Sequence, residues 1–270
     1  MKRLILTLLL ICPLWTFVWA QHDIVILHTN DTHSQIEAFV NKQGEKAGGI
    51  YNRAALIDQI KKDNQNVLLV DAGDFSQGTP YFNFFKGKQE IKFMNLLGYQ
   101  VGCFGNHEFD NGSAALAKLV KQAKFPFVCA NYYFFNKKLQ KSVKKYTIIE
   151  IDGKKIGFFG LLTDIKTITV PKSYSEIKYL NAIDIAECMV KELRDVEKCD
   201  YVVCLSHLGF DTGTEDNPDD KMLAEQVSGI DLIIGGHSHT TLKEPVLING
   251  TYIVQTGKKG ESLGKVVIKQ

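Results

Sequence analysis

Short apolar runs recur along the chain, and most of them end at a residue that could bind a metal ion. Such runs, bounded by turn residues or by helical patterns, are typical of buried β-strands. Between them, apolar side chains recur three and four positions apart, as in helices that pack one face onto a sheet. This alternation predicts an α/β sheet protein. We expect strands at residues 23–29, 67–71, 101–104, 127–130, 201–205 and 231–234, and helices at residues 54–62, 90–97, 114–123 and 183–196.

Two expected hairpins interrupt this alternation. Asp152-Gly153 and Asn249-Gly250 each separate two apolar runs, and both dipeptides favour the positive φ angles of two-residue turns. The sheets should therefore be mixed rather than wholly parallel. No period of about 20 to 50 residues repeats, and no low-complexity linker divides the chain. We expect one catalytic domain over residues 21–270.

Residues 1–20 have the pattern of a secretory signal peptide. Lys2 and Arg3 precede an uncharged stretch from residue 4 to residue 18, and Val18-Trp19-Ala20 supplies a small residue for cleavage after Ala20. The apolar stretch is shorter than the roughly 20 residues that span a bilayer. We therefore expect export to the periplasm or the outside of the cell, with no membrane span after signal cleavage.

Charge and cysteine content exclude several classes of protein. Without Lys2 and Arg3 the basic residues fall from 32 to 30, which equals the 30 acidic residues, so a nucleic acid polymer is not an expected partner. The densest basic run, residues 137–145, is expected to be a solvated loop. Six cysteines occur, and the five after residue 20 are odd in number and form no CxxC pair. We expect free thiols rather than a disulfide scaffold or a thiolate metal site.

Five segments at the ends of expected strands carry the candidate chemistry. Because the carboxyl ends of strands in an α/β sheet meet at one rim, these segments can converge. Taken alone, a Gly-Asp pair is more often a turn, and one histidine after a strand is more often a histidine with satisfied hydrogen bonds. Five of the seven histidines lie in these segments, however, and that grouping predicts a metal site. The segments are Asp31-Thr32-His33, Gly73-Asp74, Gly105-Asn106-His107-Glu108, Ser206-His207 and Gly235-Gly236-His237-Ser238-His239.

Spacing suggests how some of these residues could bind metal. Residues two apart in an extended stretch project to the same side, so Asp31 and His33 could bind one ion, and His237 and His239 repeat this arrangement. Asp74 follows a glycine that permits a sharp turn, so its carboxylate could bridge two cations. Asp71 is the alternative bridge, although it lies within the expected strand.

The segment around His107 predicts a catalytic group beside a ligand. The amide oxygen of Asn106 offers a neutral metal ligand, and the adjacent His107 remains free to act on a substrate. Asp110 could orient the His107 ring and stabilise its protonated form. The alternative is that Asn106 and Asp110 cap the helix expected at residues 114–123.

Oxygen and imidazole ligands without thiolate suit zinc, manganese, iron or cobalt, and they do not choose among these metals. Two cations would lower the pKa of a bridging water and clamp the phosphate oxygens, so that hydroxide attacks phosphorus in line. His107, as an imidazolium, would stabilise the developing charge or protonate the leaving oxygen. The residues therefore predict a two-metal phosphoester hydrolase.

The chain after residue 20 resembles the calcineurin-like metallophosphoesterases, most closely the catalytic domain of secreted bacterial 5′-nucleotidases. This resemblance implies a four-layer fold of two facing mixed β-sheets flanked by helices. It implies a catalytic pair of His107 and Asp110, and two divalent ions that share Asp74. The stretches that carry it are Asn30-Asp31-Thr32-His33, residues 73–80, residues 105–110, residues 235–239 and Gln255-Thr256-Gly257. The implied ligands are Asp31, His33, Asp74 and His239 for one ion, and Asp74, Asn106, His207 and His237 for the other.

The resemblance makes nucleoside 5′-phosphates the leading substrate class, and we expect a phosphomonoesterase. Secreted nucleotidases carry a second domain that binds the nucleobase, and we expect this sequence to lack it. The alternatives are therefore a phosphodiesterase for cyclic nucleotides or nucleotide sugars, and the catalytic half of a split nucleotidase that needs a partner chain with the nucleotide-binding domain. A non-enzymatic binding module is less expected because no ligand of the set is missing.

Overall fold

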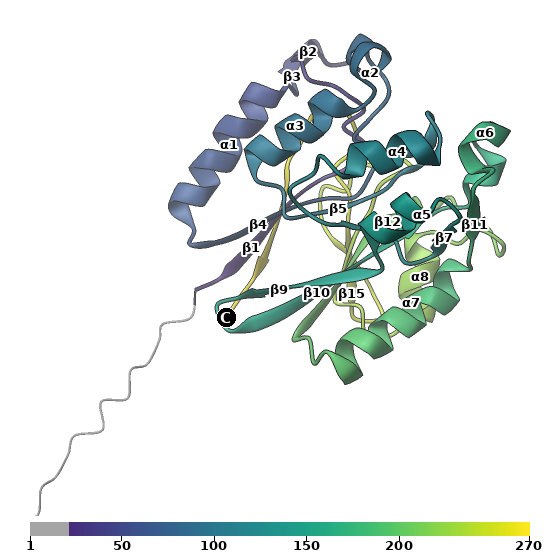
Figure 1. Cartoon of the computed structure of the whole chain (residues 1–270). Coiled ribbons are helices and arrows are strands. Elements are labelled where there is room, and N and C mark those ends of the chain that lie inside the picture. The colour runs from purple at the N-terminus through teal and green to yellow at the C-terminus, as the bar shows by residue number, and fades with distance from the viewer. Residues whose placement is uncertain (1–21) are drawn as a thin grey trace, which may run out of the picture.

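Two six-stranded β-sheets face each other in the computed structural model, which describes residues 22–270 (Figure 1). The predicted signal peptide lies outside the described residues. The first sheet has the order β16 (Gly264–Ile268), β1 (Ile24–Thr29), β4 (Asn66–Asp71), β5 (Val101–Cys103), β6 (Phe127–Val128) and β8 (Val143–Lys144). The second has the order β14 (Val246–Ile248), β15 (Thr251–Val254), β13 (Leu232–Ile234), β12 (Tyr201–His207), β10 (Lys154–Leu162) and β9 (Tyr146–Ile151).

Both sheets are mixed, as the sequence predicts. In the first sheet β16 runs antiparallel to β1, whereas β1, β4, β5, β6 and β8 pair in parallel. In the second sheet β9 and β14 are antiparallel to neighbours that pair in parallel with the other strands. The two expected hairpins are confirmed: Ile151 pairs with Lys154, and Ile248 pairs with Thr251. The predicted fold of two facing mixed sheets is therefore confirmed.

Alternating side chains along the strands supply separate apolar layers. In β1, Ile24 and Ile26 belong to the layer between the two sheets, whereas Val25 and Leu27 belong to the layer beneath the helices of the first sheet. This division follows from the two-residue period of a β-strand. Strands of the second sheet divide in the same way, so each sheet is apolar on both faces and needs a cover on its outer one.

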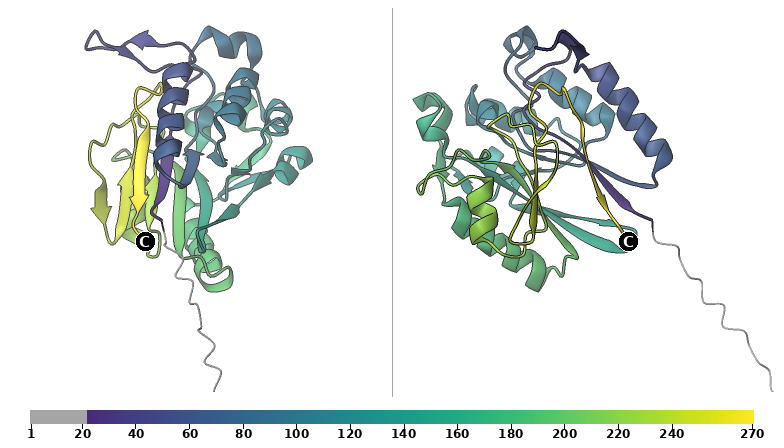
Figure 2. Two further views of the ribbon diagram at one scale, coloured as in Figure 1. Left: turned by 90° about the vertical axis from the view of Figure 1, so that its left-hand side faces the viewer. Right: turned by 180° about the vertical axis from the view of Figure 1, so that it is seen from behind.

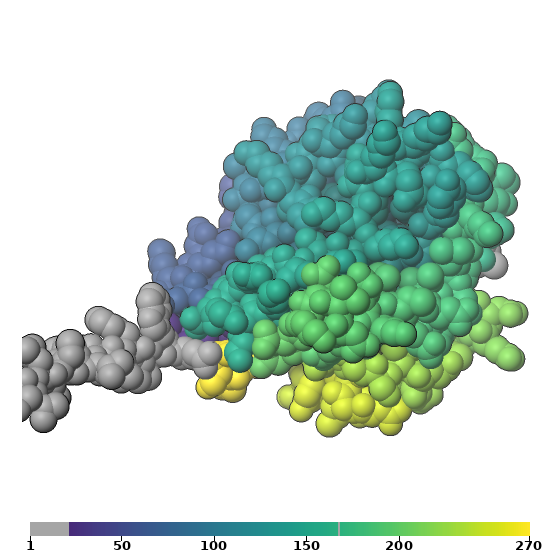
Figure 3. All heavy atoms as spheres, turned by 60° about the horizontal axis from the view of Figure 1, so that its bottom comes forward, coloured from purple at the N-terminus to yellow at the C-terminus, as the bar shows by residue number. Residues whose placement is uncertain are grey.

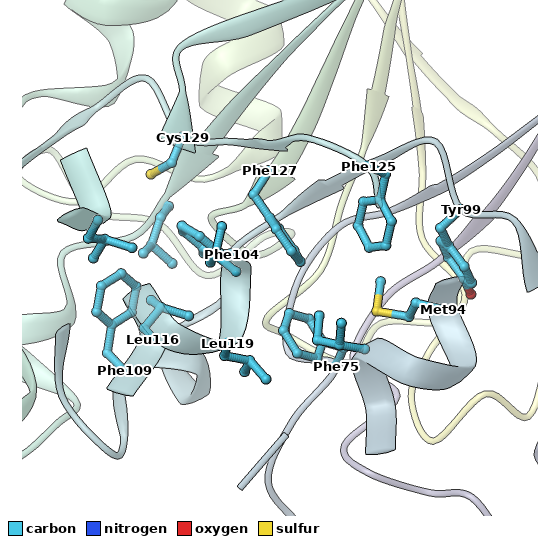
Figure 4. Packing of buried hydrophobic residues seen from close by; sticks show 14 of the residues in the cluster. Phe75, Met94, Tyr99, Phe104, Phe109, Leu116, Leu119, Phe125, Phe127 and Cys129 are labelled. Carbon is cyan, nitrogen blue, oxygen red and sulfur yellow. The ribbon is translucent and has the colours of Figure 1, made fainter. Parts of the chain in front are cut away.

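Helices provide those outer covers. Helices α1 (Ile50–Asp63), α3 (Lys88–Leu97) and α4 (Ser113–Val120) lie over the first sheet, and α7 (Ala182–Lys191) and α8 (Asp220–Gln226) lie over the second (Figures 1 and 2). Figure 4 shows the packing beneath α3 and α4, where Phe104 and Phe127 stack with ring centroids 4.9 Å apart. Figure 3 shows that the later part of the chain, in green and yellow, packs directly against the earlier part on one face.

The four predicted helices are present with shifted ends. The helix expected at residues 183–196 ends at Lys191 and continues as a π-helical turn at Glu192–Val196. Short elements without a strong apolar period escaped the sequence analysis. They are β2 (Phe39–Val40), β3 (Lys46–Ala47), α2 (Pro80–Phe85), β7 (Tyr132–Phe134), α5 (Lys137–Ser142), α6 (Pro171–Tyr174) and β11 (Ile177–Tyr179), together with α8, β8 and β16.

The prediction of a solvated loop at residues 137–145 is wrong, because this segment forms α5 and β8. The Asn136 side chain caps α5 by accepting hydrogen bonds from the Lys138 and Leu139 amides. Leu139 is fully buried, although lysines flank it, and it anchors the helix to the apolar layer beneath the helices of the first sheet. The basic run therefore forms a helix held by one buried leucine, although its charge pattern is typical of a solvated loop.

Both ends of the described chain lie together. Ile24 pairs with Ile268, and the Lys269 ammonium lies 2.6 Å from the Asp23 carboxylate. Within residues 22–270 no helix is long and apolar enough to cross a bilayer. Cys103, Cys129, Cys188, Cys199 and Cys204 are all free thiols, and only Cys188 is exposed.

The two sheets approach each other closely at Gly160 of β10. A Cβ atom at this position would lie 2.2 Å from the carbonyl oxygen of Val128 in the first sheet. Gly160→Ala should therefore lower the free energy of unfolding by about 1–3 kcal/mol, the usual cost of overpacking. Urea unfolding would measure this. Gly157→Ala is the control, because its Cβ would meet mainly the ends of the Leu193 and Cys199 side chains. Equal stability of Gly160→Ala and the unchanged protein would contradict the close approach.

Candidate metal centre

The loops that follow β1, β4, β5, β12 and β13 converge at one rim of the fold, at the carboxyl ends of parallel strands. The first two loops run side by side. The Asp31 amide donates to the Gly73 carbonyl oxygen at 2.9 Å, and the His33 amide donates to the Asp74 carbonyl oxygen at 2.9 Å. These bonds extend the pairing of β1 and β4 past the strand ends. Asp31, His33 and Asp74 are thus positioned by backbone hydrogen bonds.

The loops of the two sheets also contact each other directly. The His237 amide, from the second sheet, donates to the Asp31 carboxylate at 3.0 Å. The Asn30 side-chain amide donates to the Gly257 carbonyl oxygen at 2.8 Å. Gly236 lies at the centre of this contact, where a Cβ atom would come within 2.9 Å of the Ala72 carbonyl oxygen. Only a glycine allows the loops to approach this closely.

One group of potential ligands comprises Asp31, His33 and His239. The Nε2 atoms of the two histidines are 2.9 Å apart. They lie 3.8 Å and 3.5 Å from the Asp31 carboxylate, for His33 and His239 respectively. All three donor atoms lie within 4.8 Å of one another, so one cation could contact them all.

A second group contains Asp74, His207, His237 and Asn106. The His207 Nε2 atom is 3.2 Å from the Asp74 carboxylate, and the His237 Nδ1 atom is 2.9 Å from the Asn106 side-chain oxygen. The ring centroids of His207 and His237 are 5.3 Å apart. These contacts bring together residues that lie far apart in the sequence.

Asp74 lies between the two groups. Its Oδ2 atom is 3.2 Å from His207 Nε2 and 3.9 Å from His33 Nε2, so one carboxylate faces a histidine of each group. The alternative bridge, Asp71, instead accepts hydrogen bonds from the Thr29 hydroxyl at 2.6 Å and the Gly73 amide at 3.0 Å. The structure thus brings Asp74, and not Asp71, into the cluster.

The buried histidine His207 tests whether these residues fit a cation. Its Nδ1 atom donates to the Ala72 carbonyl oxygen at 2.8 Å, whereas its buried Nε2 atom makes no hydrogen bond within the described part of the chain. Burial alone would lower the pKa of His207, but the charges of Asp74 and Asp31 outweigh burial and raise that pKa to about 10. A site that attracts a proton this strongly also attracts a metal cation, so the donor set fits divalent ions.

The other histidines are suited to metal binding in a different way. Burial lowers the pKa of His237 and of His239 to about 4, with neighbouring positive charge as a further cause. Burial also lowers the pKa of His33. These rings are therefore neutral near pH 7 and keep the lone pair that binds a metal ion.

His107 and Asp110 form a hydrogen-bonded pair at the edge of the cluster. The His107 Nδ1 atom lies 2.9 Å from the Asp110 carboxylate. Burial lowers the pKa of His107, but the hydrogen bond to Asp110 and the charge of Asp74 outweigh it, so that the pKa is raised. The capping alternative for Asn106 and Asp110 is wrong, because α4 begins after Gly112. His107 also lies within ligand distance of His33 and Asp74, so the geometry permits either a catalytic or a ligand role.

Backbone conformation separates these loops from ordinary turns. Five of the candidate ligands have positive φ angles, a conformation that costs a non-glycine residue about 1–2 kcal/mol. Strain of this kind concentrates at functional sites, where the surrounding structure imposes it. The five are Asp31 (φ 49°), His33 (48°), Asp74 (53°), His237 (74°) and His239 (55°).

The sequence analysis missed the role of Glu108, a buried carboxylate behind the cluster. Glu108 accepts hydrogen bonds from the Asp74 amide at 2.9 Å and the Gly105 amide at 2.6 Å. It also accepts bonds from the amide and hydroxyl of Ser76, at 3.1 Å and 2.7 Å. One side chain thereby joins the Asp74 loop to the loop of Asn106 and His107. Its place directly after His107 was the available signal, but the sequence does not show its partners.

A family model described as calcineurin-like phosphoesterase matches residues 24–241. The match covers the loops that follow β1, β4, β5, β12 and β13, and most of both sheets. The chain therefore belongs to the calcineurin-like phosphoesterase family.

Individual relatives show which members of this family the chain resembles. The chain is 30% identical over 279 residues to the trifunctional nucleotide phosphoesterase protein YfkN of Bacillus subtilis, with 90% of this chain and 18% of that protein covered. It is 33% identical over 243 residues to a snake venom 5′-nucleotidase of Gloydius brevicauda, with 86% and 39% covered. The solved 5′-nucleotidase precursor of Thermus thermophilus is similar with a TM-score of 0.82 and 31% identity, over 92% of this chain and 51% of that one. The chain thus spans about half or less of the length of these relatives.

Glu108→Gln should weaken metal binding by about 10–100-fold, the usual cost of losing a residue that orients ligands. The new amide group would point a donor at backbone amides that need an acceptor. Isothermal titration with Mn²⁺ would measure the change. The control is Glu90→Gln, whose carboxylate is buried in α3 without a hydrogen-bond partner among residues 22–270. Unchanged Mn²⁺ affinity in Glu108→Gln would contradict the role given to this residue.

Proposed function

We propose that this chain hydrolyses phosphate monoesters, with nucleoside 5′-phosphates as its substrates, and that it uses two divalent cations. The observation that carries this proposal is the position of Asp74, which faces a histidine of each ligand group. A shared carboxylate is the arrangement that lets two ions act on one phosphate group. The proposed ligands are Asp31, His33, Asp74 and His239 for one ion, and Asp74, Asn106, His207 and His237 for the other.

When bound, such a pair of ions supplies Lewis acid stabilisation of the phosphate oxygens and a water nucleophile at neutral pH. The residues of the chain position the pair and exclude competing groups. Asp31 and Asp74 are almost fully buried, so their charges are poorly screened by water. The metal itself, whether zinc, manganese, iron or cobalt, is left open by this ligand set.

We assign the proton transfer to His107. With Nδ1 hydrogen-bonded to Asp110, its other ring nitrogen can donate to the oxygen of the leaving alcohol. The raised pKa of His107 favours the protonated form of the ring, which a general acid requires. Asp110 orients the ring and stabilises its charge.

The choice of nucleotides is supported by the names of relatives rather than by a base-binding surface. The similar proteins include 5′-nucleotidases, and the Bacillus relative is a trifunctional nucleotide phosphoesterase, which favours a broader nucleotide specificity as a second candidate. Phe84 in α2, beside the Asp74 loop, is 80% exposed. A partner chain that completes the nucleotide site would find an aromatic contact there.

Export remains a prediction from residues 1–20.

A substrate panel tests the proposed activity. Phosphate release from AMP should exceed that from glucose 6-phosphate, with a higher kcat/KM, while cyclic AMP and UDP-glucose should react slowly. EDTA should abolish turnover, and added Mn²⁺ or Zn²⁺ should restore it. Equal rates on AMP and glucose 6-phosphate would contradict the proposed preference for nucleotides but would leave the proposed phosphomonoesterase activity standing. No hydrolysis of any phosphoester by the metal-loaded protein would contradict the activity.

Two variants should separate ion binding from proton transfer. Asp74→Asn should lose at least one bound ion and all turnover, because a neutral amide bridges two cations poorly. His107→Ala should keep both ions and lower kcat by about 10²–10⁴-fold, the usual contribution of a general acid. Metal content by mass spectrometry and kcat would be measured together. Loss of an ion in His107→Ala would instead make this histidine a ligand.

A further inference from the structure

Asp220 is a buried carboxylate that the proposed chemistry does not use. It is the first residue of α8 and is 0% exposed. Its amide donates to the Gly209 carbonyl oxygen at 2.9 Å, which places the start of α8 against the loop that follows His207. Asp220 belongs to neither group of candidate ligands.

One oxygen of Asp220 supports the loop of His207. The Ser206 hydroxyl donates to Asp220 Oδ1, and the same hydroxyl accepts a hydrogen bond from the Leu208 amide at 3.3 Å. Ser206 and Leu208 are the two neighbours of His207 in the chain. The carboxylate therefore restrains the backbone on both sides of this histidine.

The other oxygen of Asp220 lies against the loop of His237. A Cβ atom on Gly235 would be 2.2 Å from Asp220 Oδ2, so this oxygen contacts the glycine directly. Gly235 and Gly236 lead into His237. Asp220 thus lies between the two loops whose histidines form the second ligand group.

One oxygen of Asp220 has no hydrogen-bond partner among the described residues. Oδ2 is buried and makes no hydrogen bond within residues 22–270, and no lysine or arginine there forms an ion pair with Asp220. Burial raises the pKa of this carboxyl to about 8, against the lowering effect of its bond from Ser206. A buried group without a partner destabilises a fold unless another part of the site compensates it. The closest such part is the second ligand group.

We propose that Asp220 is a positioning residue for the ion held by His207 and His237, an inference that rests on the proposed function. Its carboxylate sets the distance between the two histidine loops. Residues of this kind typically change metal affinity by about 10–100-fold.

Titration of the metal-free protein with Mn²⁺, followed by electron paramagnetic resonance, tests this inference. Neighbouring Mn²⁺ ions give a spin-coupled spectrum that differs from that of a single ion. In Asp220→Ala, which removes the contacts to both loops, the first ion should bind as before and the coupled spectrum should need about tenfold more Mn²⁺. Ser206→Ala should weaken the second ion by a smaller factor, because it removes the bond and keeps the carboxylate.

The control is Thr251→Val, a buried change in the second sheet at the start of β15. Thr251 is 1% exposed and its hydroxyl donates to the Ile230 carbonyl oxygen at 2.8 Å. It should lower thermal stability without changing either Mn²⁺ affinity. Wild-type affinity for both ions in Asp220→Ala would overturn the inference, and so would equal weakening of both ions. Absence of a coupled spectrum in the unchanged protein would instead overturn the proposed two-ion function, and the inference with it.

Discussion

The hydrogen bond from the His237 amide to the Asp31 carboxylate joins the two sheets at the point where the site is built. The ligand set is divided between the sheets. Asp31, His33, Asp74 and Asn106 follow strands of the first, whereas His207 ends β12 of the second and the other two histidines follow β13. Neither sheet alone supplies all the proposed ligands of either ion. Metal binding therefore depends on how precisely the layer of apolar side chains between the sheets sets their separation.

The site combines backbone strain with buried charges of like sign. Five candidate ligands adopt left-handed backbone conformations, and Asp31 and Asp74 are buried beside each other. Like charges in a poorly hydrated site repel, and the His207 ring, whose pKa both carboxylates raise, offsets part of this repulsion. Glu108 and Asp220 add further buried carboxylates behind the loops. A divalent ion would relieve this repulsion, so binding and stability of the rim should be closely linked.

Much of the fold was predictable because it depends on local patterns. Apolar runs marked the long strands, turn dipeptides marked both hairpins, and the residues after the strands marked the rim. The roles of Glu108 and Asp220 were not predictable, since their partners Ser76 and Gly235 lie 32 and 15 positions away and no local pattern records such contacts. The edge strand β16 was missed for the same reason: it is half-exposed and is defined by pairing with β1 at the other end of the chain.

The pairing of Ile24 with Ile268 places both described ends of the chain at the pole opposite the ligand loops (Figure 1). An attachment made at either end extends away from the reacting rim. The protein could therefore be immobilised on a resin or fused to a fluorescent reporter through residue 22 or residue 270 while its rim stays open to small solutes. The same geometry brings the ends close enough to be joined by a short linker, which would allow new ends to be opened elsewhere.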